Sequence, residues 1–599
     1  MISDPENWLH VGSLATLAAE GKRLVSGSGT AILVLCHQGR VYALDNRCPH
    51  LGFPLDRGSV DEGILTCHWH HARFELASGC TFDLWADDAP TFEVQVEDGE
   101  VWVARRPKAG NTLEHWRSRL QEGMAHDIGL VIGKAVHGWL ASGADYRELL
   151  REAAVYAAAI RDGWGTGATI LTALGALVPT LDEERRYLAL YHGIARVAAD
   201  CADQVPRRAR QPLRGAQASL GTLQRWLRQW LVVRHRDAAE RTLLTAIATG
   251  ATPGALAELL LVAATDRCYA DTGHALDFVN KAFECLDQVG WEHASRILPG
   301  VLGHLAEARG SEELTAWRHP LDLPALLAQA YTELPARLHQ GRGRYGSFSD
   351  HAGLGWRLLE DEPGALISAL SEAIGAGATP DDLGRSLSYA AALRLARFGT
   401  ANELSDWDSA HHVFTYCNAL HQLLKRRGSA AAVAPEHGWE ALRGVFHGAM
   451  ALYLTRYLNV PATPLPRPDD PRLAALPADA ESLKTALLDA FDRHQQVDLG
   501  AQIVARYLTL GHPADALIAT LTQALLREDA GFHSYQSLEA AVRQYREWGG
   551  GEAGLHVLIA ATRYLAAHAP TERAWLQTAT IARRLQRGGK VHEEPRADP

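Results

Sequence analysis

Two short segments near the beginning of the chain combine cysteine with histidine. In the first segment, one proline separates Cys48 from His50. In the second, sixteen residues further on, Cys67 precedes His70 by three positions. Two thiolates and two imidazoles are the donor set of a [2Fe–2S] cluster in which the cysteines bind one iron and the histidines bind the other. Zinc is the alternative, because the same donors can form a tetrahedral structural site, although the spacing differs from that of typical zinc fingers.

We expect short strands to position these segments, because residues 1–106 have the sequence pattern of an all-β domain. Four runs are rich in β-branched and aromatic residues, and turn-forming residues separate them. These runs lie at 31–36, 41–44, 63–67 and 92–96. Asp98-Gly99 predicts a hairpin turn after the last run. A stretch with arginine, proline and glycine at 105–111 ends the pattern, so we expect the first domain boundary there.

The two segments resemble the paired ligand boxes of the Rieske iron–sulfur domain, and the resemblance extends over about residues 7–106. It implies a small β-rich fold and single-electron transfer through a [2Fe–2S] cluster. High-potential respiratory members carry two further cysteines, whereas this chain has Phe53 and Trp69 at those positions. The resemblance is therefore to the oxygenase and ferredoxin branch. The ligands that it implies are Cys48, His50, Cys67 and His70.

The second box departs from the family pattern at its end. His71 takes the position after the last ligand, where the family commonly has glycine, and His68 lies inside the box. Because His70 alone keeps the Cys-x-x-His spacing, we expect His68 and His71 to be exposed loop histidines that bind no iron.

The rest of the chain reads as helical. Long segments rich in alanine and leucine place apolar residues at helical spacing from about residue 112 onward. The string Gly-Ala-Thr-Pro occurs at both 250–253 and 377–380. Threonine is a good N-cap and proline a good first helical residue, so each copy predicts the beginning of a helix. The repeated string predicts divergent multi-helix repeats.

The fold class expected is thus multidomain, with a small all-β domain followed by a large all-α region of up to four helical units. Between the units we expect a glycine-rich loop at 335–363 and a proline-rich linker at 461–481. The units themselves are predicted at 112–334 (units 1 and 2), 364–460 (unit 3) and 482–587 (unit 4), with a tail at 588–599.

Several histidines of the helical region occupy matching positions in the predicted repeats. Inward-facing histidines and carboxylates on packed helices form metal sites in helical bundles, and they can instead line a substrate pocket without metal. His411 lies three residues from Asp408, and His274 three residues from Asp277, so each pair shares a helix face. The pattern of the catalytic iron in Rieske oxygenases is not reproduced. The candidates are His192, His274, His411, His447, His533 and His556.

Composition and charge limit the classes of partner that the chain can bind. With 59 Lys and Arg against 70 Asp and Glu, the net charge of −11 argues against nucleic-acid binding. We expect no membrane helix, because no apolar stretch is long enough to span a bilayer, and we expect a cytoplasmic protein, because the first residues lack the pattern of a signal peptide. A dinucleotide-type glycine string at 341–346 lacks a βαβ context, so electrons must come from an external donor, a ferredoxin or a flavin reductase.

Two functions remain. The first is an oxidoreductase in which the cluster passes electrons to oxidation or oxygenation of a small organic substrate in the histidine-rich region, with a second iron or another metal as a cofactor there. The second is a non-enzymatic electron carrier or redox sensor whose helices bind a partner protein. The sequence leaves a homo-oligomer open in both cases.

Overall fold

The computed structural model describes residues 5–27, 29–108, 112–428 and 438–591. The chain divides into two compact units. One contains residues up to 146 together with residues from 574 onward, and the other contains residues 147–573. Within the described ranges, no helix is both long enough and apolar enough to cross a lipid bilayer.

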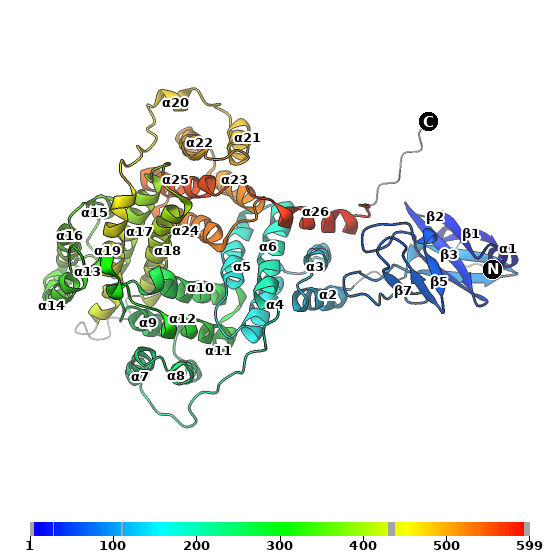
Figure 1. The fold of residues 1–599 in the computed structure, drawn as a ribbon, viewed down its shortest axis with the longest axis horizontal. Helices are drawn as coiled ribbons and strands as arrows, with labels where there is room; N and C mark the ends of the chain where they lie inside the picture. The colour runs from blue at the N-terminus through cyan, green and yellow to red at the C-terminus, as the bar shows by residue number, and fades with distance from the viewer. Residues whose placement is uncertain (1–4, 28, 109–111, 429–437, 592–599) are drawn as a thin grey trace. The chain divides into compact units, whose positions relative to one another are not determined.

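The first unit contains three small antiparallel sheets (Figure 1). The order of the hydrogen-bonded strands is β1-β9-β8 in one sheet, β2-β3-β4 in another and β5-β6-β7 in the third. The strands are β1 (Trp8–Ser13), β2 (Lys22–Gly27), β3 (Thr30–His37), β4 (Arg40–Asp45), β5 (Ser59–Asp61), β6 (Ile64–Thr66), β7 (Arg73–Glu75), β8 (Phe92–Glu97) and β9 (Glu100–Pro107), with a short helix α1 (Leu14–Glu20) after β1. The predicted all-β domain is confirmed.

Local sequence explains these strands. Ile32, Leu33 and Val34 of β3 are fully buried, because β3 is the central strand of its sheet and has both faces covered. Asp98 and Gly99 connect β8 to β9 with φ of 51° and 80°. Positive φ at both central residues is the requirement of a tight hairpin turn, so the predicted hairpin is confirmed.

Three helices belong to the same unit as the sheets: α2 (Leu113–Ala125), α3 (Gly129–Ala141) and α26 (Ala574–Gln586). This unit is therefore larger than the predicted domain 1–106. Helix α3 packs against both α2 and α26. Gly138 allows the close approach to α2, because a Cβ atom there would lie 2.1 Å from the Trp116 ring. The described part of the predicted tail also belongs to this unit, since the Val591 amide donates to the Leu51 carbonyl at 3.1 Å.

The described residues of the second unit form helices joined by loops. Its first helices are α4 (Tyr146–Ile160), α5 (Thr166–Leu177), α6 (Glu183–Cys201), α7 (Leu220–Val232), α8 (Arg236–Ala248), α9 (Pro253–Ala264), α10 (His274–Val289), α11 (Ala294–Ile297), α12 (Val301–Glu307), α13 (Thr315–Arg318) and α14 (Leu323–Gly341). The others are α15 (His351–Arg357), α16 (Pro363–Gly375), α17 (Pro380–Ala396), α18 (Leu404–Arg427), α19 (Arg443–Leu454), α20 (Pro471–Ala474), α21 (Ala480–Phe491), α22 (Val497–Thr509), α23 (Ala514–Leu526), α24 (Phe532–Trp548) and α25 (Gly551–Ala567).

The repeated string begins two helices as predicted. Thr252 caps α9 and Thr379 caps α17, each with a proline as the first helical residue. The prediction of a loop at 335–363 is wrong, because α14 continues through Pro335 to Gly341 and α15 follows. Asp350 explains α15, since its side chain accepts from the Gly353 amide and caps the helix.

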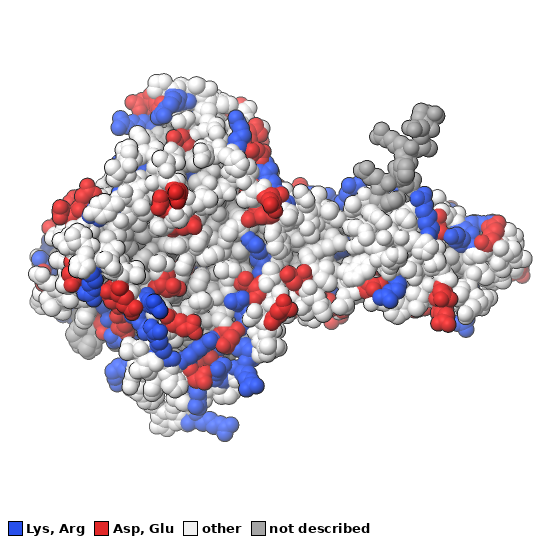
Figure 2. Space-filling model, viewed as in Figure 1, with Lys and Arg blue, Asp and Glu red and all other residues white. Residues whose placement is uncertain are grey.

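Helix α18 lies at the centre of the second unit. It is buried along most of its length and contacts α9, α10, α17 and α24. On the face shown in Figure 2, basic and acidic side chains are interspersed and separated by uncharged surface. The packing of α18 against α10 and α24 is what positions the histidines described below.

Candidate functional site

Each predicted cluster box forms a tight turn of the same geometry. The Gly52 amide donates to the Cys48 carbonyl at 2.8 Å, and the His71 amide donates to the Cys67 carbonyl at 2.9 Å. The residue that closes each turn has positive φ, 87° at Gly52 and 64° at His71. This is the backbone reason for glycine at the end of the first box. In the second box, His71 adopts the same conformation at the cost of strain.

The four predicted ligands converge between these turns. Both cysteines are buried, and the His50 and His70 rings lie edge to face with centroids 4.8 Å apart. Nδ1 of His50 is a buried ring nitrogen without a hydrogen-bond partner among the described residues. A buried nitrogen of this kind is costly unless it binds something, so the donor set fits an iron–sulfur cluster.

Within the cysteine pair, the hydrogen bond to Cys67 and then burial raise the pKa of Cys48, so this thiol is the donor of the pair. A hydrogen bond from the Cys48 thiol lowers the pKa of Cys67 to about 6, which favours the thiolate that binds metal. Burial, and then the neighbouring His70 and Lys134, lower the pKa of His50 to about 4. A neutral imidazole at His50 keeps its lone pair available at neutral pH. His68 is held elsewhere, since its Nε2 lies 2.9 Å from the Ser59 hydroxyl.

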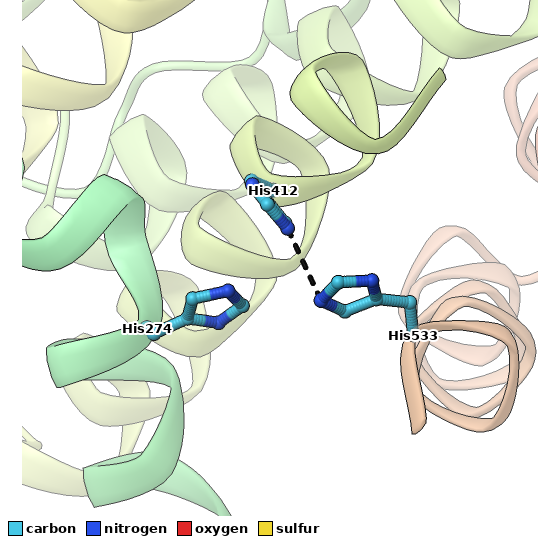
Figure 3. A group of neighbouring side chains, drawn as sticks. All are labelled: His274, His412 and His533. Atoms are coloured by element: carbon cyan, nitrogen blue, oxygen red, sulfur yellow. Dashed lines mark hydrogen bonds between the residues drawn. The ribbon is translucent and has the colours of Figure 1, made fainter. Parts of the chain in front are cut away.

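In the second unit, three histidines from three helices face one another (Figure 3). One ring nitrogen of each of His274, His412 and His533 lies within 4.8 Å of those of the other two. The Nε2 atoms of His412 and His533 are 3.1 Å apart, and the His274 and His533 rings are parallel with centroids 5.4 Å apart. We call these residues the histidine trio. Such a group of ligand atoms can hold a metal ion.

Of the six predicted histidines, His274 and His533 belong to the trio, and His411 lies beside it, stacked on Tyr564 at 4.6 Å. The remaining three lie elsewhere in the unit. Nδ1 of His192 is 3.2 Å from the Tyr535 hydroxyl, Nδ1 of His556 is 2.9 Å from the Tyr389 hydroxyl, and the His447 ring is 6.4 Å from the Tyr331 ring. The prediction missed His412, although its position four residues after Asp408 on one helix was a usable signal.

Burial lowers the pKa of two members of the trio. It lowers the pKa of His274 to about 4, with a further contribution from His533. It lowers the pKa of His412 to about 3, with contributions from His274 and His533. Both imidazoles are therefore neutral at pH 7, as metal ligands must be.

The loop before α10 places His274 in the trio through a strained backbone. Tyr269, Asp271 and Thr272 have φ of 42°, 51° and 51°, and Gly273 follows at 97°. The Asp271 amide donates to the Arg309 carbonyl at 2.9 Å, which anchors the loop. Left-handed conformations cost energy for residues with a Cβ atom, and they concentrate at functional sites.

We expect Thr272→Gly to stabilise the helical unit by about 0.5–1 kcal/mol, because glycine removes left-handed strain of about 1–2 kcal/mol and adds less unfolded-state entropy than that. The measurement is the thermal unfolding transition by calorimetry. Thr332→Gly, at an exposed position inside α14, is the matched control and should lower the transition. A lower transition for Thr272→Gly would show that the backbone there is not strained.

Further along the two helices that carry His274 and His533, buried polar groups join α10 to α24. The Gln536 amide donates to Asp277 at 2.5 Å, and Lys281 forms ion pairs with Glu284, at 2.7 Å, and with Glu539. Asp277, which shares a helix face with His274, is therefore engaged with Gln536 and is not a member of the trio. Buried pairs of this kind fix the register of two helices, and here they align the helices that carry His274 and His533.

Asp408 supports the trio from outside. One of its carboxylate oxygens accepts from the Tyr564 hydroxyl at 2.6 Å and lies 3.6 Å from both His533 Nδ1 and His568 Nε2. Burial alone would raise the pKa of Asp408, but hydrogen bonds from these neighbours hold it well below its ordinary range. A carboxylate beside the second nitrogen of a ligand histidine orients the ring and increases its basicity.

Asp408→Asn is expected to weaken metal binding by the trio about 10–100-fold, because the amide keeps the shape and loses the charge that orients His533. Competition against a chromophoric chelator measures the affinity. Asp406→Asn, in the first turn of the same helix, is the control that should bind as the wild type does. An unchanged affinity in Asp408→Asn would exclude this supporting role.

A groove of about 990 Å³ lies on the second unit. A proline-rich segment forms part of its wall, and His556 lies on another part. Side chains that line it include Trp356, Arg397, His512, Tyr545, Glu552 and His556. Its volume is in the range of pockets that bind small molecules.

Comparisons with known proteins concern the first unit. The sequence model of the family described as "Rieske [2Fe-2S] domain" matches residues 7–93. Ferredoxin CarAc of Metapseudomonas resinovorans is 31% identical over 108 residues, which cover 17% of this chain and 96% of that protein. The ferredoxin component of the p-cumate 2,3-dioxygenase system of Pseudomonas putida is 32% identical over 89 residues, 14% of this chain and 75% of that protein.

A longer relative matches over a short segment. Human apoptosis-inducing factor 3 is 33% identical over 79 residues, which are 13% of each chain. The chain thus spans about 13% of the length of this relative. The helices of the second unit lie outside residues 7–93, so the family match does not describe the histidine trio.

Proposed function

Because the chain belongs through its first domain to the family of Rieske [2Fe–2S] proteins, we propose that it is an oxidoreductase with two redox sites. An external ferredoxin or flavin reductase delivers single electrons to the first unit. The electrons are used in the second unit, at a metal held by the histidine trio, to oxidise or oxygenate a small organic substrate. The observation that carries this proposal is the convergence of three imidazoles from three helices.

In the first unit, Cys48 and Cys67 would bind one iron, and His50 and His70 the other. A bound [2Fe–2S] cluster supplies one-electron transfer. The two closed turns hold the four side chains in place before the cluster binds, which lowers the entropic cost of binding. His70 is exposed at the surface whereas His50 is half-buried, so His70 is the ligand through which electrons enter and leave.

In the second unit, the trio would supply three imidazole ligands to a metal ion, the number of protein ligands that catalytic metal sites commonly have. Imidazole suits iron, copper, nickel and zinc. Because zinc has no redox chemistry, a site that receives single electrons favours iron or copper.

The second candidate function is an electron carrier whose helices bind a partner enzyme. The names of two relatives support it, because both are ferredoxins and one is a component of a dioxygenase system. In this case the reduced protein would pass its electrons to another protein, and the trio would have no part in that transfer.

The rate of cluster reoxidation separates the two functions. The metal-loaded chain is reduced without oxygen and then mixed with oxygenated buffer, and the visible absorption of the cluster is followed. The oxidoreductase proposal predicts that His533→Ala slows reoxidation about 10-fold or more, equivalent to about 1.4 kcal/mol or more in the barrier. Equal rates in the two proteins would favour the carrier.

A further inference from the structure

A buried lysine from outside the Rieske domain reaches the first cluster box. Lys134 belongs to α3, beyond the matched residues 7–93, and its side chain is 1% exposed. Its Nζ donates to the Pro49 carbonyl at 2.5 Å and lies 3.4 Å from the His50 carbonyl. A fixed ammonium group therefore contacts the backbone of a segment that holds two cluster ligands.

Asp87 holds this lysine in place. Its carboxylate lies 2.9 Å from Lys134 Nζ and 3.2 Å from Arg119 Nε, and all three side chains are less than 10% exposed. Arg119 in turn donates to the Leu84 carbonyl at 2.9 Å and the Ala86 carbonyl at 2.7 Å. The charged group thus contains two cations and one buried anion, with the more exposed Glu122 on the far side of Arg119.

The geometry places Lys134 closer to the first box than its counter-ion. Lys134 contacts the box directly, whereas Asp87 makes its closest contacts with the two cations and reaches the box through Lys134. A small cavity of about 150 Å³ lies beside Cys48, and Lys134 and Asp87 both line it. Asp45 and Arg47, which form a separate ion pair, lie on its wall. Charges in a buried site act over short distances with little screening by water.

We propose that Lys134 is a redox-tuning residue that raises the reduction potential of the cluster. Reduction adds one electron, and so one negative charge, to the group held by the four ligands. A buried cation fixed against the backbone of the first box stabilises that added charge, and Asp87 opposes it. The helices appended to the Rieske domain thereby set how strongly the domain accepts electrons from its external donor. This inference depends on the cluster and is independent of the histidine trio.

The test is the midpoint potential of the cluster in the full chain, from a redox titration monitored by its electron paramagnetic resonance signal. Lys134→Met is expected to shift the potential to more negative values. Asp87→Asn is expected to shift it to more positive values. The double variant should lie between the two, because it removes both charges. Lys22→Met is the control, since Lys22 also donates to a backbone carbonyl, that of Asp56, but from an exposed position.

Opposite signs distinguish charge tuning from simple loosening of the loop, which would shift both single variants in one direction. Shifts of the same sign, or an unchanged potential in Lys134→Met, would overturn the proposal. If Lys134→Met loses its cluster, the comparison rests on Lys134→Arg, expected near the wild-type potential, and on Asp87→Asn. In that case an unchanged or more negative potential in Asp87→Asn would overturn it.

Discussion

Replacing His533 with alanine is expected to remove the metal from the second unit and to leave the cluster in the first unit intact. Loss of a direct ligand should weaken binding more than about 100-fold, since loss of an outer-shell partner alone costs about 10–100-fold. Metal per chain, determined by mass spectrometry after dialysis and corrected for the irons that accompany acid-labile sulfide, should fall from about one to near zero. His274→Ala and His412→Ala should behave alike, because all three nitrogens belong to one group.

His447→Gln is the matched control for this experiment. His447 is buried like the trio's neighbour His411, but it lies on α19 and is not a member of the trio. It should retain the metal. If His447→Gln loses the metal while His533→Ala retains it, the metal is held elsewhere and the trio is not the site.

The second large effect concerns the cluster itself. Cys67→Ser is expected to abolish the visible absorption, the electron paramagnetic resonance signal and the acid-labile sulfide of the protein, because a buried hydroxyl cannot replace a thiolate as a soft iron ligand. All electron delivery to the second unit should be lost with it. Cys36→Ser, at a position in β3 away from the two boxes, is the control that should retain all three signals.

The choice of histidine ligands is tested separately. His70→Ala should remove the cluster, whereas His71→Gly should retain it and relieve the strain of the positive φ at that position. His68→Ala should also retain it. A cluster that survives in His70→Ala and disappears in His71→Gly would place the ligand one residue later.

The first unit was easier to predict than the second, because its main features depend on residues that are close together in the sequence. The proposed cluster ligands lie in two short segments, so the spacing within each segment is enough to suggest them. The hairpin at Asp98-Gly99 and the helix caps at Thr252 and Thr379 are equally local, because each depends on a few adjacent residues. Such features can be identified without knowing the tertiary fold.

The histidine trio depends on three helices that are far apart in sequence, and their packing cannot be derived from local patterns. The sequence pointed to His411, whereas the structure places His412 in the trio. Successive residues of a helix differ by about 100° in direction, so identifying the inward-facing one requires knowing which neighbours surround α18. His411 instead faces Tyr564 on α25.

The extent of the first unit could not be predicted either, because it depends on packing between helices that are far apart in the sequence. Helix α26 is separated from α3 by more than four hundred residues, yet the two pack together. One local signal was available: α3 is apolar on nearly all sides and contains a single lysine, which is buried. A charged residue in such a helix needs a buried partner, and Asp87 provides it.

The proposal of two redox sites is tested by the number of electrons that the metal-loaded chain accepts in an anaerobic coulometric titration. We predict about two per chain, one at the cluster and one at the metal of the histidine trio, and about one in His533→Ala, because a [2Fe–2S] cluster accepts a single electron. A wild-type protein that carries metal at the trio and still accepts only one electron would contradict it.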